Sequence, residues 1–435
     1  MKKLSHIKRL APLFAAAAII PAAASAAEGD IEIPYGNLGL NNMTDMILDM
    51  QSKLQQSTGI TFNYDLYAVL LTNPYGGQSQ GTNYTQEMIF SLTADMDQIA
   101  GWKGGSFVIS GAYDSGENLG NKIGNFFTPS ESLVVNGAIF YQMYIRQELE
   151  TAIGKFDVKL GRISMGSNFA GLPAFGNLVS GGMDSTPEAI FSNSPFSSSP
   201  TATWGVVGSY TPVEEITLSA GLYQIPQNIA SSNWNGTNMT INSNDGYMAM
   251  FQAAWSPEFY SQKDKDGNVV QGTGLEGYYQ FGGYFYGGYD MPIFGTDDFR
   301  GNGYGFYLQG QQMVWRNQNN LSQYVTLWAG AQYAPVKSIA IMPWMVYAGV
   351  QLQGFIPHRS QDGIFVSWMT GWFSGNYERS VNTEATYETV IEVTYVYQLN
   401  SNISIQPDVQ YIMRPYGNTN IDDALVIGGQ LVVSF

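Results

Sequence analysis

The last segment of the chain, residues 424–435 (ALVIGGQLVVSF), alternates between apolar and other residues and ends in a phenylalanine. Successive side chains of a β-strand point to opposite faces, so this segment predicts a strand with one apolar face. That face would carry Leu425, Ile427, Leu431, Val433 and Phe435. An amphipathic final strand with a terminal aromatic residue is typical of bacterial outer-membrane barrels, where it pairs with the first strand and leaves no open edge. The alternative is an edge strand of a soluble β-protein.

The first residues of the chain have the pattern of an export signal. Four Lys and Arg residues among the first nine precede an apolar run over 10–20, and 24–26 (ASA) is a small-residue cleavage pattern. The apolar run is too short to span a membrane as a permanent helix. We therefore expect a signal peptide over 1–26, an N-terminal periplasmic segment over 27–59 and a barrel over 60–435.

The composition limits the kinds of partner. The expected signal peptide carries four of the 19 Lys and Arg residues and none of the 35 Asp and Glu residues, so the formal charge changes from −16 to 15 − 35 = −20. That charge argues against nucleic acid as a partner and against anionic substrates held by a general field. The chain has no cysteine, which excludes disulfides and cysteine-ligated metals, and we expect no cofactor.

Alternation along the chain predicts an all-β fold, a 16-stranded antiparallel transmembrane barrel in the outer membrane. Each candidate strand has about 9 to 14 residues, which is the length that a tilted membrane strand needs. We expect the strands at 60–70, 86–97, 104–114, 137–149, 154–163, 203–211, 216–225, 247–256, 275–286, 304–314, 324–333, 340–353, 363–373, 387–398, 403–413 and 424–435.

The lengths of the connections support this strand count. The expected external connections include the longest, at 115–136, 164–202 and 225–246, and most of the expected periplasmic turns are short. This asymmetry is typical of outer-membrane barrels. Two connections fit less well, because 257–274 is long for a periplasmic turn and 334–339 is short for an external loop.

Strand parity predicts which side chains face the lumen. The odd positions over 139–149 are mainly apolar, so we expect Gln142, Arg146 and Glu148 to point inward. An arginine facing lipid near the midplane would cost about 2–4 kcal/mol. The same reasoning places Asp157 and Lys159 in the lumen. Further inward positions are expected at Glu392, Thr394, Gln398, Gln406, Asp408 and Gln410. A lumen lined by such residues favours a water-filled pore.

A short amphipathic helix is expected before the first strand, over 44–57 (TDMILDMQSKLQQS). Thr44 would be its N-cap, Asp45 would lie in the first turn, and Gly59 follows the end. We expect the helix to pack at the mouth of the barrel, with a plug of the lumen as the alternative.

Several sequence blocks resemble one known family. Residues 406–412 (QPDVQYI), Pro415, Asp422 and 424–426 (ALV) form the most specific part of the block 388–435. This block closely resembles the C-terminal region of carbohydrate-selective porins of the OprB type. Blocks within 101–107, 161–170 and 354–363 resemble the same family. The resemblance implies a 16-stranded barrel that passes glucose and related sugars by diffusion.

The segment 164–202 is the candidate for a constriction in the lumen. A stretch of this length without predicted secondary structure usually carries function. Sugars have apolar C–H faces and hydroxyl edges, so a sugar path needs aromatic rings beside hydrogen-bonding groups. The expected residues of the path are Arg146, Glu148, Asp157, Lys159, Arg162, Phe169, Phe175, Asp184 and Glu188. The alternatives are that the phenylalanines anchor the loop to the wall and that the charged strand residues form lateral ion pairs.

The expected function is passive diffusion of neutral sugars through a monomer or a homotrimer that contacts outer-membrane lipid and lipopolysaccharide. One alternative is a general or cation-preferring porin, which the negative charge favours. Another is a structural or adhesive barrel that binds a partner through external loops such as 227–245. Catalysis is not expected, because His358 is the sole histidine after residue 26 and lies in an expected periplasmic turn.

Overall fold

The structure is a computed structural model, and it describes residues 40–130, 136–183, 185–231, 234–262, 265–266, 270 and 272–435. The expected signal peptide and the first part of the expected periplasmic segment, 27–39, lie outside the described residues.

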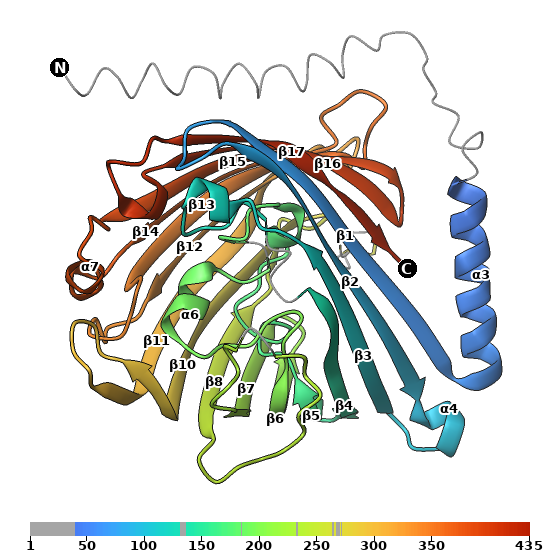
Figure 1. Cartoon of the computed structure of the whole chain (residues 1–435). Coiled ribbons are helices and arrows are strands. Elements are labelled where there is room, and N and C mark those ends of the chain that lie inside the picture. The colour runs from blue at the N-terminus through green and yellow to red at the C-terminus, as the bar shows by residue number, and fades with distance from the viewer. Residues whose placement is uncertain are drawn as a thin grey trace.

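The wall of the barrel is one antiparallel sheet that closes on itself (Figure 1). β1 (Ile60–Tyr75) pairs with β2 (Gly81–Asp95) on one side and with β17 (Ala424–Ser434) on the other. At the closure, the Phe435 N–H donates to the Tyr64 carbonyl at 2.8 Å, and the Tyr64 N–H donates to a Phe435 oxygen at 2.9 Å. The other long strands are β3 (Gly105–Gly116), β4 (Gly137–Thr151), β5 (Gly154–Ile163), β6 (Thr203–Val213), β7 (Ile216–Ile225), β8 (Gly246–Trp255), β10 (Leu275–Pro292), β11 (Phe299–Arg316), β12 (Tyr324–Tyr333), β13 (Trp344–Gln353), β14 (Gly363–Trp372), β15 (Tyr387–Asn400) and β16 (Ile403–Met413). The predicted 16-stranded barrel is therefore confirmed.

The connections predicted at 257–274 and 334–339, which fitted the barrel pattern less well, differ from the prediction. The first contains a further strand, and the second is longer than predicted. The long turn after β8 contains a further short strand, β9 (Glu258–Phe259), which pairs with the first two residues of β10. The Glu258 carboxylate also accepts hydrogen bonds from the N–H groups of Gly272 and Gly274, at 3.0 and 2.6 Å. The external loop after β12 is longer than expected, because β13 begins at Trp344.

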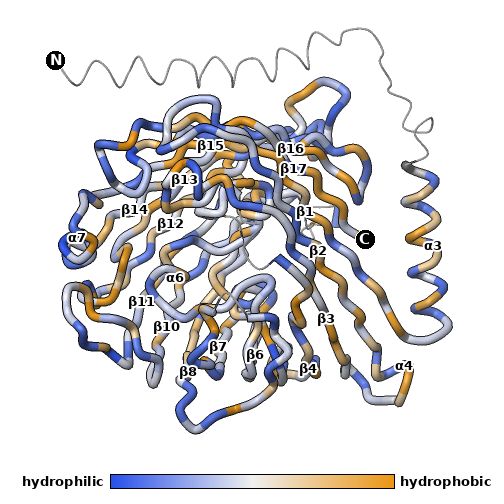
Figure 2. The backbone as a smooth tube through the Cα atoms, in the orientation of Figure 1, coloured by the Kyte–Doolittle hydropathy of each residue, from blue (hydrophilic) through white to orange (hydrophobic). Residues whose placement is uncertain are grey.

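The outer face of the wall is apolar, as lipid contact requires. Figure 2 shows apolar and polar residues alternating along β1, β2 and β3. On β4 and β5, Ile145 and Leu160 are 41% and 55% exposed on the outer face. Arg146 is half-buried and points into the lumen, so the predicted alternation holds in this half of β4.

A β-bulge in β4 changes the predicted faces in the other half of that strand. The pairing of β3 with β4 shifts register between Ile109 and Gly111, which leaves one extra residue on β4. Parity predicts Ile139 and Tyr141 on the lipid side, whereas the structure buries both, at 5% and 4% exposure. A bulge depends on the partner strand as well as on the bulged strand, so alternation within one strand does not reveal it.

The N-terminal helix α3 (Leu40–Thr58) begins earlier than expected. Thr44 lies inside it and is not the N-cap, because 40–43 (LNNM) contains no residue that stops a helix. Figure 1 shows α3 beside the barrel, near the start of β1, and not inside the lumen. The Gln51 side chain donates to the Phe62 carbonyl at 2.6 Å. None of the described helices is long and apolar enough to cross a membrane.

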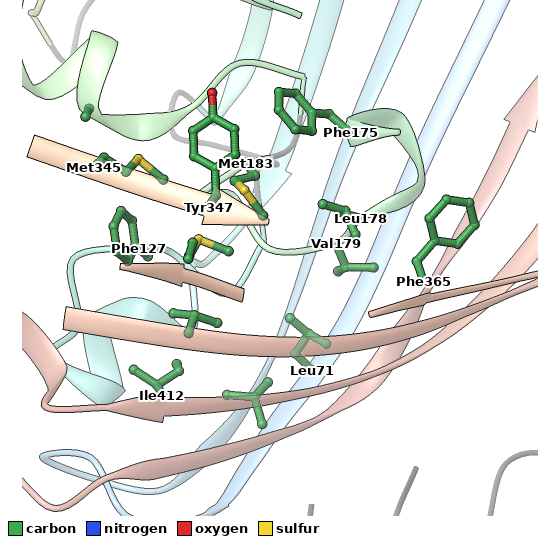
Figure 3. Packing of buried hydrophobic residues seen from close by; sticks show 14 of the residues in the cluster. Leu71, Phe127, Phe175, Leu178, Val179, Met183, Met345, Tyr347, Phe365 and Ile412 are labelled. Atoms are coloured by element: carbon green, nitrogen blue, oxygen red, sulfur yellow. The ribbon is translucent and has the colours of Figure 1, made fainter. Parts of the chain in front are cut away.

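Two external loops fold into the lumen. They carry the short helices α5 (Gly120–Ile123), in the loop after β3, and α6 (Glu188–Asn193), in the loop after β5 (Figure 1). Their apolar side chains pack against inward-facing residues of the wall (Figure 3). The cluster includes Phe127, Phe175, Leu178, Val179 and Met183 from the loops and Leu71, Met345, Tyr347, Phe365 and Ile412 from the wall. Each such side chain contributes about 1.5–3 kcal/mol when fully buried, so packing closes this part of the lumen.

Candidate functional site

Two buried glutamates of β15 hold the lumen loops by their backbone. The Glu392 carboxylate accepts hydrogen bonds from the N–H groups of Val179 and Ser180, at 2.6 and 2.9 Å. The Glu388 carboxylate accepts from the N–H groups of residues 126 and 127, both at 2.7 Å. Glu392 therefore points inward as predicted, but it positions a loop and does not line open space.

The neighbouring strand β16 also holds the loop after β3, the one that contains residues 126 and 127. The Gln410 side chain donates to the Pro129 carbonyl and to Asp408 Oδ1, both at 2.8 Å. The Thr394 hydroxyl donates to Asp408 Oδ2 at 2.7 Å. These contacts use up much of the inward-facing polar surface of β15 and β16, so the open path must lie elsewhere in the lumen.

Two cavities lie along the inward face of β2, β3 and β4. The outer cavity, of ≈ 380 Å³, is at the external ends of β2 and β3, and its lining includes Thr85, Asp114, Glu117, Asn118, Asn121 and Asn125. The inner cavity, of ≈ 290 Å³, is nearer the periplasmic side, and its lining includes Ser91, Ser106, Ser110, Tyr141, Tyr144 and Arg146. On β2 the outer cavity reaches Gln86 and the inner cavity begins at Ile89. The two cavities therefore follow one another along the same wall.

Arg146, which lines the inner cavity, belongs to a balanced group of charges on β4 and β5. Arg146 Nε and Nη2 donate to the two oxygens of Asp157, both at 2.9 Å, in a bidentate pair. Arg146 also contacts Glu148 Oε1 at 2.9 Å. Lys159 donates to the Asn168 side chain at 2.7 Å, which ties the loop after β5 to the wall. The structure thus brings together four of the residues that the sequence predicted for the path, two basic and two acidic.

Residues 79–435 match the family model described as carbohydrate-selective porin, OprB family. The chain belongs to the OprB family of carbohydrate-selective porins. This membership and the closed barrel together indicate an outer-membrane protein.

Individual members and relatives of the family are distant in sequence but similar over most of their length. Porin B of Pseudomonas aeruginosa is 22% identical over 418 residues, which cover 87% of this chain and 88% of that protein. The putative porin QuiX of Acinetobacter baylyi is 22% identical over 424 residues, covering 87% and 90%. The high-pH structure of Pseudomonas putida OprB superposes with a TM-score of 0.77 at 18% identity, covering 89% of this chain and 96% of that one. At this identity the superposition shows the shared barrel fold.

Between the two cavities of this OprB-family barrel lies a zone that sequence reasoning missed, where the loop after β5 contacts the wall. Glu87 of β2 points inward there and accepts a hydrogen bond from the Ser199 hydroxyl at 2.7 Å. The Tyr141 hydroxyl lies 3.3 Å from the Ser167 hydroxyl. Both serines belong to the loop after β5, so that loop forms one side of the zone. The odd-position polar residues of β2, Asn83, Thr85 and Glu87, carried the signal that could have predicted this face.

The structure places Arg162 on the opposite face from the one expected. It shares its face of β5 with the exposed Val158 and Leu160, yet it is only 1% exposed. The external loop after β7 covers it, because Arg162 donates to the Asn238 carbonyl at 3.0 Å and lies 5.8 Å from the Trp234 ring centroid. Arg162 therefore fastens a loop over the outside of the wall and lies outside the lumen. Parity within β5 already pointed this way, since Asp157 and Lys159 are odd positions.

The two phenylalanines of the path prediction lie in packed contacts. Phe169 packs edge-on against Tyr223 at 6.4 Å between ring centroids, and Phe175 packs edge-on against Tyr347 at 5.7 Å. Both are almost completely buried. Their position matches the alternative interpretation, in which they anchor the loop to the wall. Of the two acidic residues of that loop, Glu188 is half-buried at the start of α6, and Asp184 lies outside the described residues.

Proposed function

We propose that this porin lets small neutral carbohydrates, of the size of glucose, diffuse passively across the outer membrane along the two cavities. The observation that carries the proposal is the balanced charge group beside the inner cavity, formed by Arg146, which lines the cavity, with Glu148, Asp157 and Lys159. A sugar hydroxyl both donates and accepts hydrogen bonds, so alternating donors and acceptors on one wall match a row of hydroxyls. Family membership supports the same class of solute.

The charge balance favours a neutral solute over a charged one in the inner cavity. Arg146 is already paired with two carboxylates, and its Nε and Nη2 groups both donate to Asp157. An anionic or cationic solute would therefore have to compete with existing ion pairs, whereas a hydroxyl can add to them at their free edges. Tyr144 lies beside the group and offers an aromatic face, with Lys159 Nζ 5.9 Å from its ring centroid. Aromatic faces pack well against the C–H face of a sugar.

The dimensions of the path favour a monosaccharide. The inner cavity, at ≈ 290 Å³, is at the small end of ligand sites, which hold drug-sized molecules at about 300–1,000 Å³. The packed loops occupy part of the lumen, which leaves less room for a longer chain. We therefore expect glucose to pass faster than maltose, and maltose faster than a longer maltodextrin.

The test is permeation through the purified porin in liposomes and planar bilayers. Liposome swelling compares glucose, maltose and an amino acid, and bilayer recordings measure the block of ion current by glucose. In Arg146→Ala we expect the half-blocking glucose concentration to rise by about tenfold, as the loss of about 1.4 kcal/mol of binding would give. Arg379→Ala, an exposed arginine of α7 (Gly375–Val381), is the matched control and should behave like the wild type. Equal rates for glucose, maltose and the amino acid in the wild type would refute the proposal.

We also propose that export removes residues 1–26, and N-terminal sequencing of protein from outer membranes should then begin at Ala27. Light scattering in detergent tests whether the barrel is a monomer or a homotrimer. Neither measurement depends on which solute passes.

A further inference from the structure

Two acidic side chains face each other across β2 and β3 in the lumen. Glu87 and Asp114 are directly opposite in the register of the two strands. Both point inward and are nearly inaccessible, at 7% and 2% exposure. Like charges directly opposite on neighbouring strands destabilise a sheet. A function at this position would explain why the pair is tolerated.

Among the residues that line the outer cavity beside this pair, three oxygen atoms have no hydrogen-bond donor among the described residues. Neither carboxylate oxygen of Asp114 has a hydrogen-bond partner among the described residues, and the same holds for Oδ1 of Asn125. Both residues line the outer cavity. Leaving a buried carboxylate without a partner is costly, far more so than leaving a neutral polar group. The unsatisfied atoms are all acceptors, so a ligand that satisfies them must bring positive charge or donors.

No basic side chain of the described residues fills this role. The described lining of the outer cavity contains no Lys or Arg, and its only other charged residue is Glu117. The basic residues of the path, Arg146 and Lys159, belong to the group around the inner cavity. The outer cavity is therefore acidic where the inner cavity is balanced.

We propose that the outer cavity is a cation site in which Asp114 and the neighbouring amide oxygens hold a partly hydrated divalent cation such as Ca²⁺, while Glu87, opposite Asp114, adds negative charge beside the site. Ca²⁺ accepts six to eight oxygen ligands in flexible geometry, including carboxylates, amide oxygens and water. The lining supplies Asp114 and Asn125, with Asn118 and Asn121 at the same rim. The volume of ≈ 380 Å³ is several times the roughly 30 Å³ that one water occupies in the liquid, so the ion can keep much of its hydration shell.

The position of the site gives it a consequence for transport. Any ion that enters along this wall from the external side meets the outer cavity before the inner one. A bound divalent cation would compensate Asp114 and Glu87 and would obstruct the passage of monovalent cations. The empty site would attract K⁺ and repel Cl⁻. Calcium should therefore reduce both the K⁺ current and the preference of the pore for K⁺ over Cl⁻.

The test uses the purified full-length porin, refolded without lipopolysaccharide so that lipid-bound calcium does not interfere. Planar-bilayer recordings in a KCl gradient measure the reversal potential before and after CaCl₂ is added to the external side. In the wild type we expect block at sub-millimolar to millimolar Ca²⁺, the range of weak extracellular calcium sites. In Asp114→Asn the block should be lost, and the permeability ratio of K⁺ to Cl⁻ without Ca²⁺ should fall by about twofold or more.

Two controls keep the result interpretable. Glu215→Gln removes an exposed acid from a periplasmic turn and should keep the calcium block and the ion preference of the wild type. Glu87→Gln removes the other carboxylate and should reproduce the effect of Asp114→Asn, and heat modifiability on gels shows whether each variant has folded. Ca²⁺ should raise the melting temperature of the wild type and not that of Asp114→Asn.

An unchanged reversal potential and calcium block in both Asp114→Asn and Glu87→Gln would overturn the proposal. The proposed sugar function is tested separately, because liposome swelling with glucose in calcium-free buffer measures no ion current. Loss of the calcium block in Asp114→Asn, with the wild-type block kept in Glu215→Gln, is the expected pattern and is read without reference to the rate of glucose uptake.

Discussion

The anchoring of the loop after β5 by Glu392 makes a sharp prediction. Replacing Glu392 by alanine removes the acceptor of the Val179 and Ser180 N–H groups, which lie at 2.6 and 2.9 Å. A hydrogen bond contributes about 0.5–1.5 kcal/mol net, so we expect the docking of the loop to weaken by about 1–3 kcal/mol.

The strand ladder of the barrel is untouched by this change, so the barrel should still assemble while the loop loosens. Hydrogen exchange followed by mass spectrometry should show faster exchange in peptides that contain 179–180, and single-channel recordings should become noisier. Glu392→Gln keeps one acceptor and should give a smaller effect. Glu388→Ala should loosen the segment around 126–127 instead and leave 179–180 protected. Unchanged exchange at 179–180 in Glu392→Ala would refute the reasoning.

Three further predictions follow from the faces, the packing and the hydrogen bonds. Ile145→Arg puts a charge on the lipid face at a cost of about 2–4 kcal/mol and should impair folding into liposomes. Arg146→Ala should fold normally, and equal folding yields of the two variants would contradict the face assignment. Phe175→Ala leaves a cavity between the loop and Tyr347 and should lower the free energy of unfolding by about 3–5 kcal/mol in urea titrations, and a change well under this range would mean that the site collapses around the gap. The Thr419 hydroxyl and N–H donate to Glu384 and lower its pKa, so this external contact is present at neutral pH and is lost as pH falls below the ordinary glutamate value of about 4.3. The protection factor of the Thr419 amide, its exchange measured against the intrinsic rate at each pH, should fall over that range, and Glu384→Gln should remove this change.

The architecture of this barrel could be predicted from its sequence because lipid imposes a period of two on every strand. Alternation of apolar and polar residues predicts the last strand and the even number of strands. The segments where this alternation ends predict the three long external loops. The faces of Ile145, Arg146, Asp157 and Lys159 follow in the same way. The prediction fails at Ile139 and Tyr141, because a bulge changes parity without any local signature.

The site was less predictable, because its geometry depends on how the loops fold back into the lumen. Alternation along β15 could predict that Glu392 faces inward. It could not predict that two backbone N–H groups of a distant loop would donate hydrogen bonds to its carboxylate. It missed Glu87 and Asp114, whose pairing across two strands becomes visible only once the register is known. It misplaced Arg162, since an arginine on an outer wall is expected only where something covers it.

Glu388 and Glu392 hold the loops by main-chain N–H groups, and these groups are present in every residue except proline. The identity of the loop side chains at 126–127 and 179–180 is therefore not what these anchors require. Attachment and selectivity are separate properties in such a barrel, and the residues that meet a solute can change while the loop stays in place. An engineer could accordingly graft a loop of another composition onto the same two carboxylates and alter which solute passes without redesigning the wall.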